Sequence, residues 1–267
     1  MLRMAIEHIM ALFRDRIEAA EQLSSRVQEW LDNHNNNGET SRQKIEPQQE
    51  IHTDDNDVII VLAIPRGGVV IGDIISNTLH GKLDIVVSRK IGAPDNAELA
   101  IGAVMPDGSY FLNQDIVNVL NVPKYYIIEQ ASIQKKEIER RLQSFRGQNI
   151  DYYYHDYNNF EGKIVVLVDD GIATGATILS AAQWLKTKQN CCKILIVAVP
   201  VAPPPPSPMY SSLNEDIVSK LNQIADKVIV LYRPDPFYSV GQFYDHFNQV
   251  EDAEVKEIMK RHGYRPM

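Results

Sequence analysis

The sequence of 267 residues is poor in cysteine and in long apolar runs. Its two cysteines, Cys191 and Cys192, are adjacent, which disfavours a conventional disulfide or a metal site, so we interpret both as reduced thiols. No apolar run approaches the roughly 20 residues of a membrane helix, and the amino terminus lacks the basic-then-apolar order of a signal peptide. We therefore expect a cytoplasmic protein without a membrane partner.

Basic residues are also fewer than acidic residues. Lys and Arg total 27 against 35 Asp and Glu, which gives a formal net charge of -8 and a pI near 5.4. This balance argues against general binding to nucleic acid or to anionic membranes. A phosphorylated ligand would have to meet individually placed cations. Hydrophobic residues make up 44% of the chain, enough to build a sizeable core.

One stretch, KIVVLVDDGIATGAT at 163–177, organises the rest of the sequence. The aliphatic run 164–168 stops at Asp169 and Asp170, which predicts a buried central strand ending in two carboxylates. A small, hydroxyl-rich loop follows, and residues 176–188 have a helical pattern. Unpaired N–H groups and the macrodipole favour an anion at such a helix start. The loop residues are Gly171, Ile172, Ala173, Thr174, Gly175, Ala176 and Thr177.

The two carboxylates suit a different part of the same ligand. They would repel a phosphate, so their expected partners are sugar hydroxyls or a hard cation such as Mg²⁺. Ribose 5-phosphate satisfies both halves. A Walker loop would need Gly-Lys-Ser/Thr where this chain has Gly175-Ala176-Thr177. The pattern resembles the phosphoribosyl pyrophosphate signature of type I phosphoribosyltransferases.

A second strand-turn-helix pattern lies earlier in the chain. Residues 58–64 read as a strand, followed by Pro65-Arg66-Gly67-Gly68 and an apolar helical stretch to about Leu79. Two glycines let the backbone approach a ligand closely, and the arginine adds a fixed positive charge. In the resembling family this turn holds pyrophosphate, which makes Arg66, Gly67 and Gly68 candidates for that role. The alternative is a structural turn with an exposed arginine.

A third candidate element follows the shorter predicted strand 83–88. Arg89 and Lys90 come directly after it, and two adjacent cations at a strand end suit an anion pocket. Residues 91–99 read as a loop, and in the resembling enzymes a flexible loop here closes over the pyrophosphate. The alternative, that both basic residues are simply solvated, stays open.

The amino-terminal part has helical apolar spacing from about Ala5 to Leu31, which predicts an amphipathic helix. Residues 13–19 also resemble the opening of a poorly characterised subgroup of predicted phosphoribosyltransferases, but we interpret the arginines there as lying on a solvated helix face. Residues 32–57 are polar, with almost nothing to bury, and are expected to form a mobile insertion.

Further strands and helices complete the predicted order. Residues 100–105 and 110–113 suggest an antiparallel hairpin, 123–145 a long packing helix, and 213–225 another helix. Residues 194–199 and 228–232 read as strands, the first ended by Pro200. Strands separated by helices imply right-handed crossovers. The prediction is one α/β domain over 1–267, three-layered, with a mainly parallel sheet of about five strands, helices on both faces, an antiparallel hairpin and a small hood.

The carboxyl-terminal segment 233–267 is dense in aromatic residues near its start. The resemblance implies that it contributes to the hood over an acceptor, where Phe237, Tyr238 or Phe243 could stack on a flat ring. Sealing the bottom of the sheet is an equally weighted alternative. An aromatic run at 152–155 is expected to cover a strand edge or the core rather than stack on a base.

The resemblance implies an enzyme of nucleotide metabolism that transfers ribose 5-phosphate from Mg²⁺-bound phosphoribosyl pyrophosphate to a nitrogenous base or other amine, releasing pyrophosphate. Asp169 and Asp170 would hold the ribose hydroxyls, directly or through Mg²⁺, and Arg66, Arg89 and Lys90 would serve the leaving group. The alternative is a non-catalytic sensor of phosphoribosyl pyrophosphate or a nucleotide. Gly171 stands where relatives carry a larger side chain, which leaves the acceptor unnamed. A homodimer is expected only by analogy.

Overall fold

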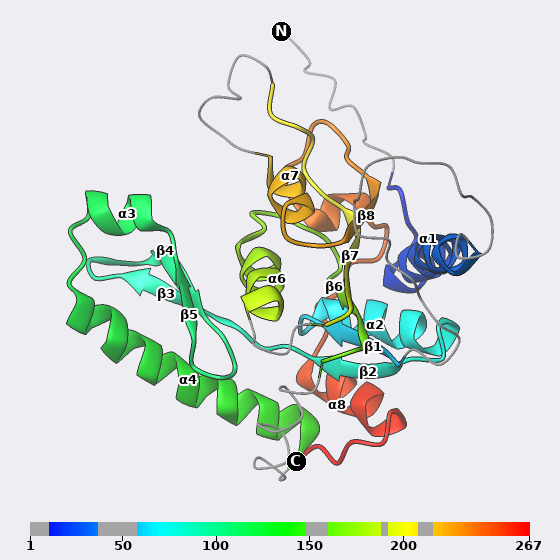
Figure 1. Cartoon of the computed structure of the whole chain (residues 1–267), viewed down its shortest axis with the longest axis horizontal. Coiled ribbons are helices and arrows are strands. Elements are labelled where there is room, and N and C mark those ends of the chain that lie inside the picture. The colour runs from blue at the N-terminus through cyan, green and yellow to red at the C-terminus, as the bar shows by residue number, and fades with distance from the viewer. Residues whose placement is uncertain (1–10, 37–57, 148–159, 188–191, 208–215) are drawn as a thin grey trace, which may run out of the picture.

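A computed structural model describes residues 11–36, 58–147, 160–187, 192–207 and 216–267 (Figure 1). Its main sheet has five parallel strands in the order β2-β1-β6-β7-β8. The strands are β1 (Ile59–Ala63), β2 (Lys82–Ile85), β6 (Ile164–Val168), β7 (Ile194–Val201) and β8 (Lys227–Tyr232). This order confirms the predicted mainly parallel sheet.

Helices cover both faces of this sheet (Figure 1). On one side lie α1 (Arg16–Asn36) and α2 (Gly67–Thr78), and on the other α6 (Ala176–Thr187) and α7 (Ile217–Asn222). The chain passes from β1 to β2 in one direction and from β6 through β7 to β8 in the other, so right-handed crossovers place α2 opposite α6 and α7. The three predicted layers are therefore present.

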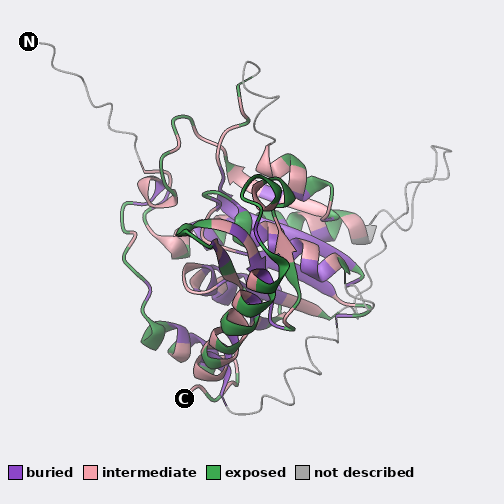
Figure 2. Cartoon of the chain, turned by 90° about the vertical axis from the view of Figure 1, so that its left-hand side faces the viewer, coloured by how far each residue is buried: buried purple, intermediate pink, exposed green. Residues whose placement is uncertain are grey.

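The core is centred on β6 and β7, whose residues are all buried (Figure 2). Both strands read as continuous apolar runs because each is covered on two faces. Residues directly after β6 consequently emerge from the middle of the sheet at its carboxyl edge, where open α/β sheets bind ligands.

A smaller antiparallel sheet stands beside the main one (Figure 1). It has the order β3-β4-β5, with β3 (Arg89–Ala93), β4 (Asn96–Val104) and β5 (Tyr110–Leu112), and is followed by α3 (Gln114–Val119) and α4 (Lys124–Arg146). Helix α4 runs from this sheet to the carboxyl-terminal helix α8 (Asp252–Arg261). Trp184 of α6 donates its indole N–H to Asp107 at 2.8 Å, which ties the β4–β5 turn to the main layer.

The prediction of a loop over residues 91–99 is wrong, because most of this segment belongs to the β3–β4 hairpin. Ile91 pairs with Gly102 and Gly92 with Ala100, and a β-bulge interrupts the register there. A Cβ on Gly92 would lie 2.7 Å from the carbonyl oxygen of Ala97, so this glycine permits close strand pairing. The predicted hairpin between 100–105 and 110–113 is confirmed by the pairing of β4 with β5.

The first helix begins later than predicted. Residues 11–15 are not helical, and Phe13 instead forms an isolated bridge with Tyr244. Asp15 starts the helix because its Oδ1 accepts the N–H groups of Ile17 and Glu18 at 2.9 and 3.0 Å. The helix continues to Asn36, so the proposed insertion is helical over 32–36. Residues 1–10 and 37–57 lie outside the described residues, as do 152–155.

The prediction that Pro200 ends its strand is wrong, because Pro200 lies inside β7. The last β6 partner of β7 is Ala198, and the β8 ladder uses Val199 and Val201. The β7–β8 ladder accordingly skips Pro200, which has no N–H to donate, and resumes at Val201 and Tyr232. Among the described residues, no helix has the length and apolar character needed to cross a membrane.

Candidate active site

Asp169 and Asp170 follow β6 at the carboxyl edge of the sheet, and the start of α2 lies against them. A Cβ on Gly67 would lie 1.9 Å from Oδ2 of Asp170, and one on Gly68 would lie 3.0 Å from the Cα of Asp169. Both glycines are therefore needed to pack the two predicted motifs together. The sequence pointed to close approach of a ligand, whereas the structure shows close approach of the acid pair.

Arg16 of α1 is the cation of this acid pair. Its Nε donates to Oδ2 of Asp170 at 2.8 Å, and only 11% and 16% of the two side chains are exposed. Its Nη1 donates to the carbonyl of Asn248 at 2.8 Å, and its guanidinium lies 3.8 Å above the ring of Phe247. The interpretation as a solvated helix-face arginine is wrong for Arg16. Arg14 is solvated, with 63% of its side chain exposed, but it lies before the helix begins.

The carboxyl-terminal segment holds the other side of Asp170. The hydroxyl of Tyr244 donates to the backbone carbonyl of Asp170 at 2.7 Å. The Tyr244 ring packs on Phe13 and Phe247 with centroids 5.3 and 5.0 Å away. Burial, with the nearby negative charge of Asp170, raises the pKa of the Tyr244 hydroxyl, so it remains a donor.

The environment of the acid pair favours a cation or hydroxyl donor. Burial, together with the charge of Asp170, raises the pKa of Asp169 well above its ordinary value. Burial also raises the pKa of Asp170, an effect that Arg16 opposes. Two carboxylates brought this close are stabilised in their ionised form by any further positive charge that reaches them.

The predicted phosphate loop is fixed to the sheet at Ile172, and most of its other residues are exposed. The N–H of Ile172 donates to the carbonyl of Val201 at 2.8 Å, and the Ile172 side chain is buried. Gly175 has a φ of +77°, which favours glycine, and leads into α6. Ala173, Thr174, Ala176 and Thr177 are exposed. Among the described residues, the backbone N–H groups of 174–178 have no hydrogen-bond acceptor, as an anion site requires.

Gly171 is small because other side chains fill its surroundings. A Cβ there would lie 2.6 Å from Cγ1 of Val240 and 2.8 Å from Cγ2 of Val201. Val240 belongs to the short 3-10 helix η1 (Val240–Phe243) of the carboxyl-terminal segment. The departure seen in the sequence at Gly171 therefore has a packing cause.

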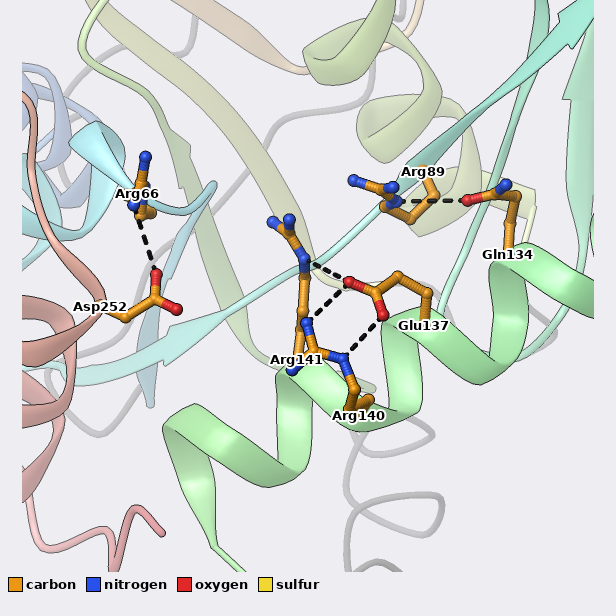
Figure 3. A network of polar contacts seen from close by, with 7 residues as sticks. All are labelled: Arg66, Arg89, Gln134, Glu137, Arg140, Arg141 and Asp252. Carbon is orange, nitrogen blue, oxygen red and sulfur yellow. Dashed lines mark hydrogen bonds and ion pairs between the residues drawn. The ribbon is translucent and has the colours of Figure 1, made fainter. Parts of the chain in front are cut away.

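The predicted cations come from two separate parts of the fold (Figure 3). Arg66 stands at the start of α2, with Nη1 3.4 Å from Oδ1 of Asp252. Arg89 of β3 donates Nε to Gln134 of α4 at 3.2 Å. The structure does not bring Lys90 to the same place, because successive strand residues face opposite ways and Lys90 pairs at 2.9 Å with the exposed Glu98.

The acid pair fits Mg²⁺ as far as its donors are concerned. Within the described residues, no group of three or more His, Cys, Asp or Glu side chains could hold a metal by itself. Mg²⁺ is usually bound through one or two carboxylates, with substrate phosphates and water as its other ligands. Asp169 and Asp170 supply that number, and one oxygen of each is already oriented by a hydrogen bond.

Comparison with known proteins agrees with this arrangement. Residues 14–222 match the model of the phosphoribosyl transferase domain family. The chain belongs to this family. Two Mycobacterium tuberculosis proteins, named "Putative phosphoribosyl transferase" MT0597 and Rv0571c, are each 32% identical over 252 residues, covering 94% of this chain and 47% of the relative. The chain therefore spans about half the length of these relatives.

A solved structure, TT1426 from Thermus thermophilus, is similar to this phosphoribosyl transferase domain with a TM-score of 0.64 and 29% identity. The similarity covers 93% of this chain and 98% of TT1426. The family match ends at residue 222, so it leaves out β8, η1 and α8. Tyr244 and Phe247, which hold Asp170 and Arg16, lie in this remainder, within the aromatic segment that the sequence assigned to a hood or to the bottom of the sheet and not to the acid pair.

Proposed function

We propose that this phosphoribosyl transferase domain transfers ribose 5-phosphate from Mg²⁺-bound phosphoribosyl pyrophosphate to a nitrogenous base or other amine, releasing pyrophosphate. One observation carries the proposal: an acid pair and a loop with open N–H groups share the end of β6. The first suits hydroxyls or a cation and the second suits a phosphate, and ribose 5-phosphate presents both.

The roles of Asp169, Asp170 and the loop after them, the acid half of the site, follow from their chemistry. Asp169 and Asp170 would accept hydrogen bonds from the ribose hydroxyls, directly or through Mg²⁺. The loop Gly171–Thr177 would bind the 5-phosphate through its open N–H groups and the hydroxyls of Thr174 and Thr177. Arg16 would hold Asp170 in its ionised form and in one orientation.

The cationic half would bind the leaving group. The bond from ribose C1 to pyrophosphate breaks with its electron pair departing on the pyrophosphate, and the acceptor nitrogen then forms the new bond and loses a proton. Arg66 and Arg89 would stabilise the negative charge that develops on the departing oxygen, and Lys90, which faces away, is not assigned to this group. Bound Mg²⁺ would neutralise part of the pyrophosphate charge. No protein nucleophile is needed.

The acceptor would lie under the carboxyl-terminal segment. Phe243 is fully buried and packs on Phe237 with centroids 5.1 Å apart, so Phe243 seals the core. Tyr238 has 82% of its surface exposed and is the better candidate for stacking on a flat acceptor.

Two successive measurements test the proposal. Calorimetry with phosphoribosyl pyrophosphate and Mg²⁺ should detect binding to the full chain. Release of pyrophosphate should then appear with at least one member of a panel of bases and amines. Absence of binding would overturn the proposal, whereas binding without release on every acceptor would favour the sensor.

A further inference from the structure

Helix α4 presents two hydrogen-bond acceptors on one face. Gln134 and Glu137 are three residues apart and therefore neighbours on the helix surface. The Gln134 Oε1 accepts from Nε of Arg89 at 3.2 Å, and the Glu137 Oε1 accepts from Nε of Arg141 at 3.1 Å (Figure 3). Arg89 and Arg141 are thus each held through Nε.

This mode of attachment leaves the ends of both guanidinium groups available. Among the described residues, the terminal nitrogens of Arg89 and Arg141 have no hydrogen-bond or ion-pair partner. The Arg141 side chain is 37% exposed. Figure 3 shows its terminal nitrogens pointing into the space between Arg66 and Arg89. Arg89 and Arg141 are thus held against α4, and in this view Arg66, at the start of α2, lies across from them.

The neighbouring Arg140 behaves differently. Its Nε and Nη2 both bind Glu137, at 2.7 and 2.9 Å, and 66% of its side chain is exposed. Hydrogen bonds from Arg140, and then from Arg141, lower the pKa of Glu137 to about 2 against a smaller opposing effect of burial. Glu137 is thus ionised near neutral pH, and it balances only one of the two arginines that it holds.

We propose that Arg141, positioned by Glu137, is a further binding residue for the pyrophosphate group of the substrate and of the released product. Like charges held near one another repel unless an anion lies between them. A guanidinium presents two N–H donors that match two phosphate oxygens, and an Arg with free terminal nitrogens can bind in this bidentate way. The inference rests on the proposed function, because it assigns a residue to the leaving-group side of that site.

The position of Arg141 gives this contact a second effect. Arg66 belongs to the main sheet layer, whereas Arg89 and Arg141 belong to the antiparallel sheet and to α4. A pyrophosphate bound by all three would connect these two parts of the fold. Arg66 itself pairs with Glu251 and Asp252 of the carboxyl-terminal segment, at 3.8 and 3.4 Å.

Calorimetry on the full chain tests the proposal with two separate probes, inorganic pyrophosphate with Mg²⁺ and ribose 5-phosphate. Arg141→Gln should weaken pyrophosphate binding by about tenfold or more, the loss expected for charge-assisted hydrogen bonds. It should leave ribose 5-phosphate affinity unchanged. Arg141→Lys keeps the charge without the planar fork and should give a smaller loss of pyrophosphate affinity.

Arg140→Gln is the matched control, since it removes the same charge from the adjacent helix position. It should change pyrophosphate affinity by less than about twofold, because two of its three guanidinium nitrogens are already bound to Glu137 and its charge is neutralised there. Equal losses in Arg140→Gln and Arg141→Gln, or an equal loss for both probes, would overturn the proposal. So would unchanged pyrophosphate binding in a folded Arg141→Gln, and Arg141→Lys provides the same comparison if Arg141→Gln does not fold.

These outcomes separate the inference from the proposed function. If the natural chain binds both probes and Arg141→Gln binds them equally well, the role of Arg141 is lost and the transferase proposal stands. If the natural chain binds neither probe, the proposed function itself is overturned. Glu137→Gln should reduce pyrophosphate affinity less than Arg141→Gln, since it removes the carboxylate that positions Arg141 and leaves the guanidinium itself.

Discussion

The two halves of the candidate site are built in different ways. The acid half stands at the end of a fully buried strand, where Gly67 packs on Asp170 and Arg16 binds it with little exposure. The cationic half, Arg66, Arg89 and Arg141, is assembled from the start of α2, from β3 and from α4, and Arg66 pairs with the exposed Glu251 and Asp252. Core packing thus fixes the acid half, whereas surface contacts fix the cationic half.

This difference predicts unequal energetics. Exposed ion pairs contribute roughly 0–1 kcal/mol each, whereas breaking a shielded pair leaves an uncompensated charge in a poorly solvated place. Substitutions in the acid half should therefore affect both folding and binding. Substitutions in the cationic half should affect mainly binding.

The largest effect is expected from Arg16→Gln. Loss of its ion pair with Asp170 and its stacking on Phe247 should lower the free energy of unfolding by about 3 kcal/mol, near the lower end for buried pairs. Denaturant unfolding measures this. Arg14→Gln is the control and should change stability by less than about 0.5 kcal/mol because its side chain is exposed. Similar effects of the two substitutions would mean that Arg16 is not part of the acid half.

Gly67→Ala should have the next largest effect. The added Cβ would lie 1.9 Å from the Asp170 carboxylate, and relieving this overlap should cost about 2–3 kcal/mol of stability. Gly68→Ala meets its nearest atoms at 3.0 Å and should cost less. Thermal unfolding of both variants gives the comparison, and equal losses would argue against the close packing of α2 on the acid pair.

Asp170→Asn should weaken the binding of phosphoribosyl pyrophosphate with Mg²⁺ by about 1–3 kcal/mol, the scale of a lost hydrogen bond to a charged group. Calorimetry at neutral pH is the measurement. Unchanged affinity in this variant would remove the proposed carboxylate role.

The smallest effect on stability is expected from Glu137→Gln in the cationic half. Because the pKa of Glu137 is lowered to about 2 by Arg140 and Arg141, its ion pairs stabilise the fold above the ordinary pKa near 4.5. That contribution is lost as pH falls toward 2. The variant should therefore be less stable than the natural chain by about 1 kcal/mol or less at pH 7, with the gap closing on acidification. A gap that widens in acid would contradict the sign.

The sheet and the central motif could be predicted because their signals are local. A buried strand is an apolar run, and the residues after it must emerge at the carboxyl edge, so the positions of Asp169 and Arg66 follow from strand order. The hairpin of β3 and β4 was missed because Gly92, Pro94, Asp95 and Asn96 are all turn formers, although only two of them form the tip.

The partners of Asp170 could not be predicted for the opposite reason. Arg16 lies 154 positions before it and Tyr244 lies 74 positions after it. No periodicity connects residues so distant, and an arginine on an amphipathic helix looks the same in sequence whether it faces water or a carboxylate. Similarly, the glycines at 67 and 68 carry no sign of what packs against them.

Because Gly171 contacts Val240, the substitutions tolerated at one of these positions depend on the residue at the other. A side chain at 171 would overlap Val240 first and Val201 next, so an enlarging substitution needs a smaller residue at 240 and a shift of Val201. Among relatives we therefore expect these two positions to vary together and in opposite directions of size. Position 171 would then change by paired steps in a fixed order, not by single replacements.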